Sequence, residues 1–236
     1  RPMRHGFEES PFNPVPPVVW ALVLPVAVGE LAFGLGAAGI LGGADGIGLR
    51  GRLLEFAAYP PGMVLRMWQW GQIVWDQLYR VASYPFVHYG LTHAAFVAVF
   101  TLALGKVLSD SFRPWAVVAL FFGCAMGAAV VYTGAAALLP AIRFEPLVGG
   151  YPPVYGFVGA FTFLLWTRLG QTGGKRLRAF SLIGMLLAFQ LTFGLVFGAA
   201  GMAWLAEIAG FVLGFGLSFV LVPGGPARVR QALRQR

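Results

Sequence analysis

The sequence is dominated by apolar stretches of about 18 residues or more, and no other feature constrains its fold as strongly. A helix of about 20 apolar residues crosses the hydrocarbon core of a bilayer. No water satisfies backbone N–H and C=O groups there, so such a stretch must be helical. Hydrophobic residues make up 58% of the chain and charged residues 11%, whereas a soluble domain carries about 25% charged residues. We therefore expect the 236 residues to form one all-α membrane protein.

Six segments are apolar and long enough to be predicted as membrane-spanning helices. Prolines lie at or near several of their ends, where a missing backbone N–H costs least. The expected organisation is a polar tail over 1–16, a transmembrane domain over 17–223 and a basic tail over 224–236. The six predicted spans are residues 17–42, 84–107, 115–139, 153–169, 177–198 and 202–222.

Segment 43–83, between the first two spans, combines aromatic and charged side chains. Its residues 62–80 hold three tryptophans, a tyrosine, two arginines and an aspartate. Amphipathic rings with flanking charges prefer the boundary between membrane and water. We predict interfacial helices lying beside the bundle, and an irregular loop is the alternative.

Lysine and arginine gather at the ends of the predicted spans, as expected for residues that determine topology. With the N-terminus inside, the inner loops and tails hold 12 of them and the outer segments hold 5. Both termini are therefore predicted to be cytoplasmic, in a bacterial-type inner membrane, and no nucleic-acid partner is expected. The inner set is Arg1, Arg4, Lys106, Arg113, Arg168, Lys175, Arg176, Arg178, Arg228, Arg230, Arg234 and Arg236, and the outer set is Arg50, Arg52, Arg66, Arg80 and Arg143.

Three polar motifs stand at defined places in the second, fourth and sixth spans. They read HYGLTHAAFV from position 88, GGYPPVYGFVG from position 149 and AEIAGFVLG from position 206. In this order they resemble the rhomboid family of intramembrane serine proteases, and the resemblance covers residues 17–223. It implies a six-transmembrane-helix bundle with a membrane-embedded loop between the first two helices. It also implies a site where a Ser–His dyad joins helices four and six.

The reacting residues of the rhomboid family are replaced in this sequence. The family's serine falls at Tyr151 and its histidine at Glu207. The oxyanion positions hold His93 and Val97, while the other helix-two histidine matches His88. Peptide hydrolysis by this scheme needs an alcohol or thiol activated by an adjacent base. The resemblance therefore implies a pseudoprotease with no catalytic residue.

The residues that pack helices in the rhomboid family are present. Tyr155 matches the tyrosine that packs against the catalytic histidine. Small residues at a spacing of three or four let two helices approach closely, which is the expected role of four glycines in the fourth and sixth spans. These glycines are Gly156, Gly159, Gly210 and Gly214.

Two acidic residues lie inside predicted spans, where a carboxyl group usually has a partner. Glu207 is predicted to form a polar latch with Tyr151, Tyr155 or His93. A neutral, hydrogen-bonded side chain with a purely structural role and a proton acceptor in a residual water cavity remain the alternatives. Glu30, in the first span, raises the same question, and the sequence offers no partner for it.

No metal or cofactor is expected. His88 and His93 lie five residues apart, about 140° apart around a helix, and no third histidine or cysteine is near them. The only cysteine, Cys124, lies in an apolar run and is expected to be an inert packing residue.

Three functions remain open from the sequence. The first is an inactive rhomboid-like protein that binds other transmembrane helices or serves as an accessory subunit of a membrane complex. In the family, the lateral opening at helix five would admit such a client helix. The second is an active protease or hydrolase that uses Tyr151, Glu207 and His93. The third is a conduit for protons or small solutes, motivated by Glu30 and Glu207. The expected partners are the lipid bilayer and other transmembrane proteins.

Overall fold

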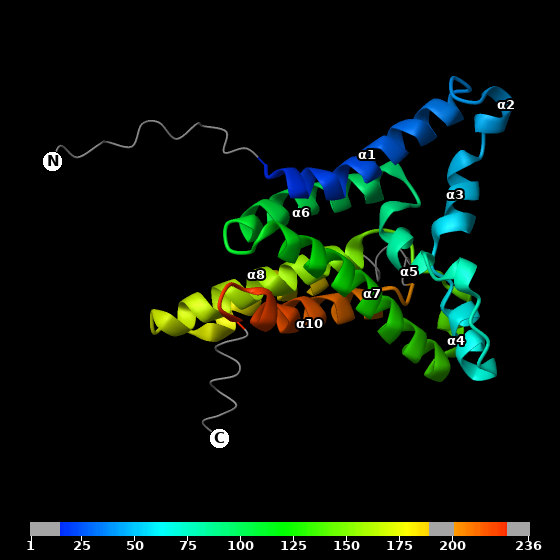
Figure 1. The fold of residues 1–236 in the computed structure, drawn as a ribbon. Coiled ribbons are helices and arrows are strands. Elements are labelled where there is room, and N and C mark those ends of the chain that lie inside the picture. Colours follow the sequence, from blue (N-terminus) through cyan, green and yellow to red (C-terminus); the bar gives the residue numbers. More distant parts are fainter. Residues whose placement is uncertain (1–14, 189–200, 226–236) are drawn as a thin grey trace, which may run out of the picture.

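The computed structural model describes residues 15–188 and 201–225 of the chain. Within these residues the regular structure is helical, apart from one isolated antiparallel bridge between Tyr59 and Leu147. The all-α prediction is therefore confirmed for the part of the chain that is described. Figure 1 shows long helices gathered in one bundle, with shorter helices on one side of it.

Four helices in the described residues are long and apolar enough to cross a membrane. They correspond to the first, second, third and sixth predicted spans. The structure therefore supports an integral membrane protein. These helices are α1 (Pro17–Ala37), α6 (Leu91–Ser109), α7 (Pro114–Leu138) and α10 (Trp204–Leu221).

The fourth and fifth predicted spans are not among these four helices. The fourth corresponds to α8 (Tyr151–Gln171), a helix of 21 residues that falls outside this apolar set. In the fifth, residues 181–188 are helical, whereas 189–198 lie outside the described residues. Gln190 and Thr192 are polar residues that the sequence suggests as interhelical hydrogen-bond formers, and they too lie outside the described residues. The count of six spans stays a prediction.

Several helix ends differ from the predicted boundaries. Helix α1 ends at Ala37 rather than at residue 42, and Gly39 beyond it has a φ of +71°, a conformation that suits glycine. Helix α6 begins at Leu91 rather than at residue 84, because Gly90 before it is extended and the preceding residues form the 3₁₀ turn η2 (Tyr84–Phe86). The predicted fifth span begins with the 3₁₀ turn η4 (Arg176–Phe180).

The segment between α1 and α6 is largely helical. Its aromatic side chains remain open to the surroundings: Trp68, Trp70 and Trp75 are 69%, 70% and 75% exposed. Their location at the membrane surface stays a prediction. The helices of this segment are α2 (Gly43–Gly46), α3 (Leu49–Ala57), α4 (Pro61–Trp70), the 3₁₀ turn η1 (Trp75–Gln77) and α5 (Arg80–Ser83).

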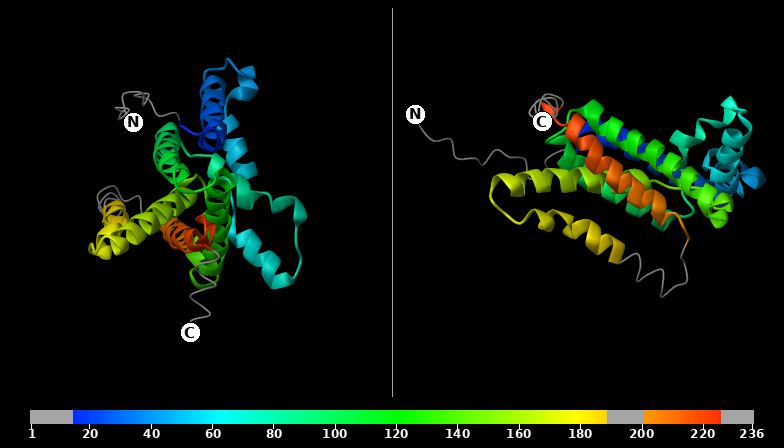
Figure 2. Two further views of the ribbon diagram at one scale, coloured as in Figure 1. Left: turned by 60° about the vertical axis from the view of Figure 1, so that its left-hand side comes forward. Right: turned by 90° about the horizontal axis from the view of Figure 1, so that it is seen from below.

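Helix α10 packs against both α7 and α8, and Figure 2 shows it between them. Its contact with α8 is a contact between backbones. A Cβ atom at Gly214 would collide with the carbonyl oxygen of Gly156, and one at Gly210 with that of Pro152. A Cβ atom at Gly159 would in turn collide with the carbonyl oxygen of Phe211. Only glycine permits this approach, which brings the start of α8 next to the start of α10.

Candidate functional site

The start of α8 is held by hydrogen bonds from the two glycines that precede it. The N–H of Gly149 donates to the carbonyl oxygen of Tyr84 at 2.9 Å, and the N–H of Gly150 donates to Nε2 of His88 at 3.4 Å. Gly149 has a φ of +92°, and a Cβ atom there would overlap the ring of His93. The glycine pair therefore lets α8 begin directly against the histidines that precede and open α6.

Tyr151 covers His93. Their rings are stacked with centroids 4.7 Å apart and planes inclined by 21°. The ring of His88 meets the other side of the cluster edge-on, 4.9 Å from His93. Val97, 2% exposed, lies against Gly150, where a Cβ atom would approach its Cγ1 to 2.6 Å. A phenol ring and an isopropyl group therefore lie beside His93 and the glycine pair at the start of α8.

Glu207 faces this cluster from α10. Its side chain is 6% exposed and interacts electrostatically with the phenols of both Tyr151 and Tyr155. Tyr155 is 7% exposed, and both it and Glu207 have interaction partners. The structure therefore brings together the four residues of the expected latch, including His93 through its stack with Tyr151. A hydrogen-bonded latch stays a prediction.

Two histidine nitrogens in the cluster are buried without a hydrogen-bond partner among the described residues. They are Nδ1 of His88 and Nε2 of His93. Across the described ranges, no group of three or more His, Cys, Asp or Glu side chains is arranged to hold a metal ion. Cys124 is fully buried, and its sulfur fills the space that a side chain at position 156 would need.

Glu30 has a partner that the sequence did not suggest. Arg50 of α3 pairs with it in bidentate fashion, with both N–O distances at 2.8 Å. The same guanidinium donates to the carbonyl oxygen of His88 at 2.9 Å and lies 4.7 Å from the ring centroid of Phe33. The hydrogen bond with Glu30 and the charge of Glu30 raise the pKa of Arg50. One arginine therefore ties α1, α3 and the segment before α6 together.

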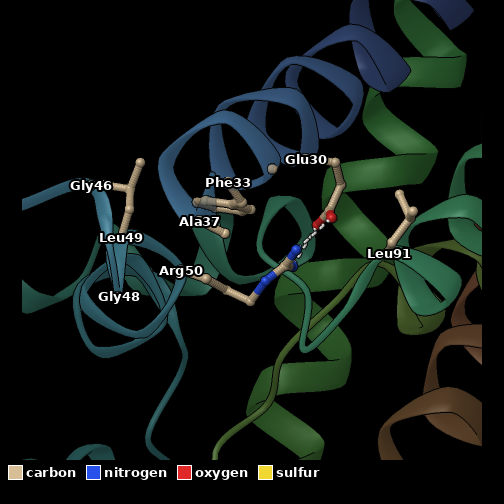
Figure 3. Close-up of a pocket in the computed structure, with 9 residues that line it drawn as sticks. Glu30, Phe33, Ala37, Gly46, Gly48, Leu49, Arg50 and Leu91 are labelled. Carbon is tan, nitrogen blue, oxygen red and sulfur yellow. Dashed lines mark hydrogen bonds and ion pairs between the residues drawn. The ribbon is translucent and has the colours of Figure 1, made fainter. Parts of the chain in front are cut away.

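A pocket of about 200 Å³ lies beside this ion pair. Figure 3 shows Glu30 and Phe33 of α1 on one wall, Leu49 and Arg50 of α3 on another, and Leu91 at the start of α6. This pocket was not expected from the sequence. The only signal for it was the unpaired carboxylate in the first span, together with arginines in the segment that follows.

A second acidic residue organises the start of α10. The two carboxylate oxygens of Glu145, which precedes α8, each accept from the backbone N–H of Met202 at 2.9 Å. A carboxylate beside the N-terminal end of a helix is stabilised by the free N–H groups and by the helix dipole. This contact holds the segment before α10 against the segment before α8. It was not expected from the sequence.

The comparisons with known proteins identify the family of the chain. The family model of the Rhomboid domain matches residues 75–224, more than half of the chain. A comparison with curated proteins finds no match. The matched region contains the clustered His88, His93, Tyr151 and Glu207, as well as the glycine contact between α8 and α10. The chain belongs to the rhomboid family.

Proposed function

We propose that this protein is a rhomboid-family pseudoprotease that binds transmembrane helices of other membrane proteins or serves as an accessory subunit of a membrane protein complex. One observation carries the proposal: the family's nucleophile and base positions hold Tyr151 and Glu207, and Tyr151 is stacked on His93. The proposed setting is a bacterial-type inner membrane with both termini in the cytoplasm.

The chemistry of the cluster supports the absence of proteolysis. A phenol has an ordinary pKa near ~10 and is a poor acyl acceptor beside a carboxylate. Val97 has no donor for an oxyanion, and the loss of one such donor costs about 10²–10³ in rate. Pro152 removes a further backbone N–H next to the site. Acyl transfer would therefore lack its nucleophile, its base and part of its electrostatic stabilisation.

The alternatives have less support. An enzyme built on Tyr151, Glu207 and His93 would need the phenol to leave its stack with His93. A conduit for protons rested on two acidic residues, and Glu30 is accounted for by its pairing with Arg50. Proton flux into liposomes that contain the purified protein tests the conduit directly, and we expect the flux of empty liposomes.

The absence of activity is tested with a fluorophosphonate probe and a rhomboid-type transmembrane substrate, with an active rhomboid protease assayed in parallel. We expect neither labelling nor cleavage by this protein. Tyr151→Phe and Glu207→Gln serve as matched variants. The proposal would be overturned if the wild type cleaves the substrate and either substitution abolishes that cleavage.

Client binding is tested with a photo-crosslinking amino acid at Met185, which is 63% exposed on the helix over 181–188, the predicted helix five. Val131 on α7, 49% exposed, is the matched control. We expect discrete protein adducts from Met185 and none of the same mass from Val131. Identical adduct patterns at both positions would mean that no client enters beside helix five.

A further inference from the structure

We propose that the pocket beside Glu30 and Arg50 binds the phosphoethanolamine headgroup of a phospholipid, with the phosphate at Arg50 and the ammonium at Glu30. Its volume of about 200 Å³ is many times what a single water needs, so it admits a group of several heavy atoms. The pocket does not include Tyr151 or Glu207, so the proposal is independent of the proposed function.

Arg50 has donors left for a phosphate. Its Nη1 group donates to Glu30 and to the carbonyl oxygen of His88, and its Nη2 group donates once, to Glu30. The Nε–H and the second Nη2 hydrogen therefore donate to no other described residue. In a guanidinium these two hydrogens lie parallel on one edge, the fork that pairs with two oxygens of a phosphate. The side chain is 28% exposed, so a ligand can reach it.

The charge balance of the pocket selects a zwitterion. Glu30 and Arg50 cancel each other, so a ligand with a net negative charge would leave an uncompensated charge in a poorly solvated place. A phosphate with an attached ammonium avoids this, because the ammonium can donate to the remaining lone pairs of the Glu30 carboxylate. A quaternary ammonium carries the same charge but has no N–H to donate.

The position of the pocket suits a lipid rather than a soluble zwitterion. Glu30 lies seven residues before the last residue of α1, which is about 10 Å along the helix axis. The pocket extends from Glu30 along α1 to Ala37, the last residue of the helix, and the end of a membrane-spanning helix is where lipid headgroups are found. On α1 next to Glu30, Val28 and Leu31 are 61% and 63% exposed and offer an apolar surface for the chains. Phe33 and Leu49 supply apolar walls inside the pocket.

Native mass spectrometry of the full-length protein in mild detergent tests the proposal. The protein is titrated with phosphatidylethanolamine, phosphatidylcholine or phosphatidylglycerol of identical acyl chains. We expect one phosphatidylethanolamine to be retained, with about tenfold weaker retention of the other two, the factor expected for loss of one charge-assisted hydrogen bond. Inorganic phosphate and phosphoethanolamine without chains are added as competitors, and neither should displace the lipid at equal concentration.

Gly34→Leu is the decisive variant. Gly34 lines the pocket, and a Cβ atom there meets nothing within 4 Å, so a leucine at this position is expected to extend into the pocket and leave the ion pair in place. We expect it to weaken retention about tenfold. Gly134→Leu on α7 makes the same change into open space away from the pocket and should retain the lipid as the wild type does.

Arg50→Lys tests whether lipid binding needs the planar pair of N–H donors or only the positive charge. A lysine keeps a cation opposite Glu30 but has no planar pair of donors, so retention of phosphatidylethanolamine should fall while the melting temperature stays close to that of the wild type. Equal retention by wild type and Gly34→Leu would overturn the proposal. So would preferential retention of phosphatidylglycerol or displacement of the lipid by inorganic phosphate.

Discussion

The carboxylate of Glu30 lies within α1 and is 8% exposed, while the guanidinium that neutralises it comes from α3, outside the four apolar helices. A buried charge that loses its partner costs several kcal/mol, whereas replacement of both partners by apolar groups is often neutral. The net contribution of the pair to stability is therefore smaller than the loss measured when only one of the two residues is replaced.

A double-mutant cycle measures this coupling. Glu30→Leu leaves Arg50 unpaired, and Arg50→Leu leaves Glu30 unpaired inside α1. We expect each to lower the free energy of unfolding by about 1–3 kcal/mol, and the double variant to lower it by less than the sum. Thermal unfolding in detergent provides the measurement. Additive effects would mean that the two side chains do not stabilise each other.

The stack of Tyr151 on His93 is a second contact between single residues. Tyr151→Phe keeps the ring but removes the hydroxyl of the predicted latch, so it should lower the melting temperature less than Tyr151→Ala does. Tyr151→Ala also removes the stack and should cost about 0.5–1.5 kcal/mol beyond the loss of buried area. Glu207→Gln keeps the shape and hydrogen-bonding capacity of the side chain and should be nearly neutral for folding. Strong destabilisation by Glu207→Gln would show that the negative charge itself is needed.

Among the helices, α8 and α10 make the closest contact. Their backbones meet at glycines, so a side chain at the contact separates the helices instead of adding packing. Gly214→Leu should therefore lower the yield of folded protein severely. Gly216, on the same helix, has nothing within 4 Å of its added Cβ atom, so Gly216→Leu should fold like the wild type. Size-exclusion profiles in detergent compare the two, and equal profiles would contradict the contact.

Helices that depend on local apolar composition could be predicted from the sequence. The runs that became α1, α6, α7 and α10 were identifiable by length and hydropathy alone. The ends of these helices were harder to predict, because glycines interrupt the apolar sequence there. Gly39 follows the end of α1, and Gly90 delays the start of α6. The pairing of Glu30 with Arg50 was inaccessible, since it depends on how the chain after α1 folds back. The motif residues could be placed only because the rhomboid framework fixes which helices meet.

At the scale of the whole molecule, the distribution of basic residues predicts the orientation in the membrane. Single cysteines test it, because the native Cys124 is fully buried and should not react. Phe144→Cys and Leu177→Cys create thiols at sites that are 86% and 84% exposed. A membrane-impermeant maleimide should label Phe144→Cys in intact cells and Leu177→Cys only after permeabilisation. The opposite pattern would invert the predicted topology.

The glycine contact between α8 and α10 has an evolutionary consequence. The helices meet through the carbonyl oxygens of Pro152 and Gly156, so the contact does not depend on which side chains stand at positions 151 and 207. We therefore expect exchange of residues 151 and 207 during evolution to leave the assembled bundle intact, whereas loss of Gly214 should prevent its assembly.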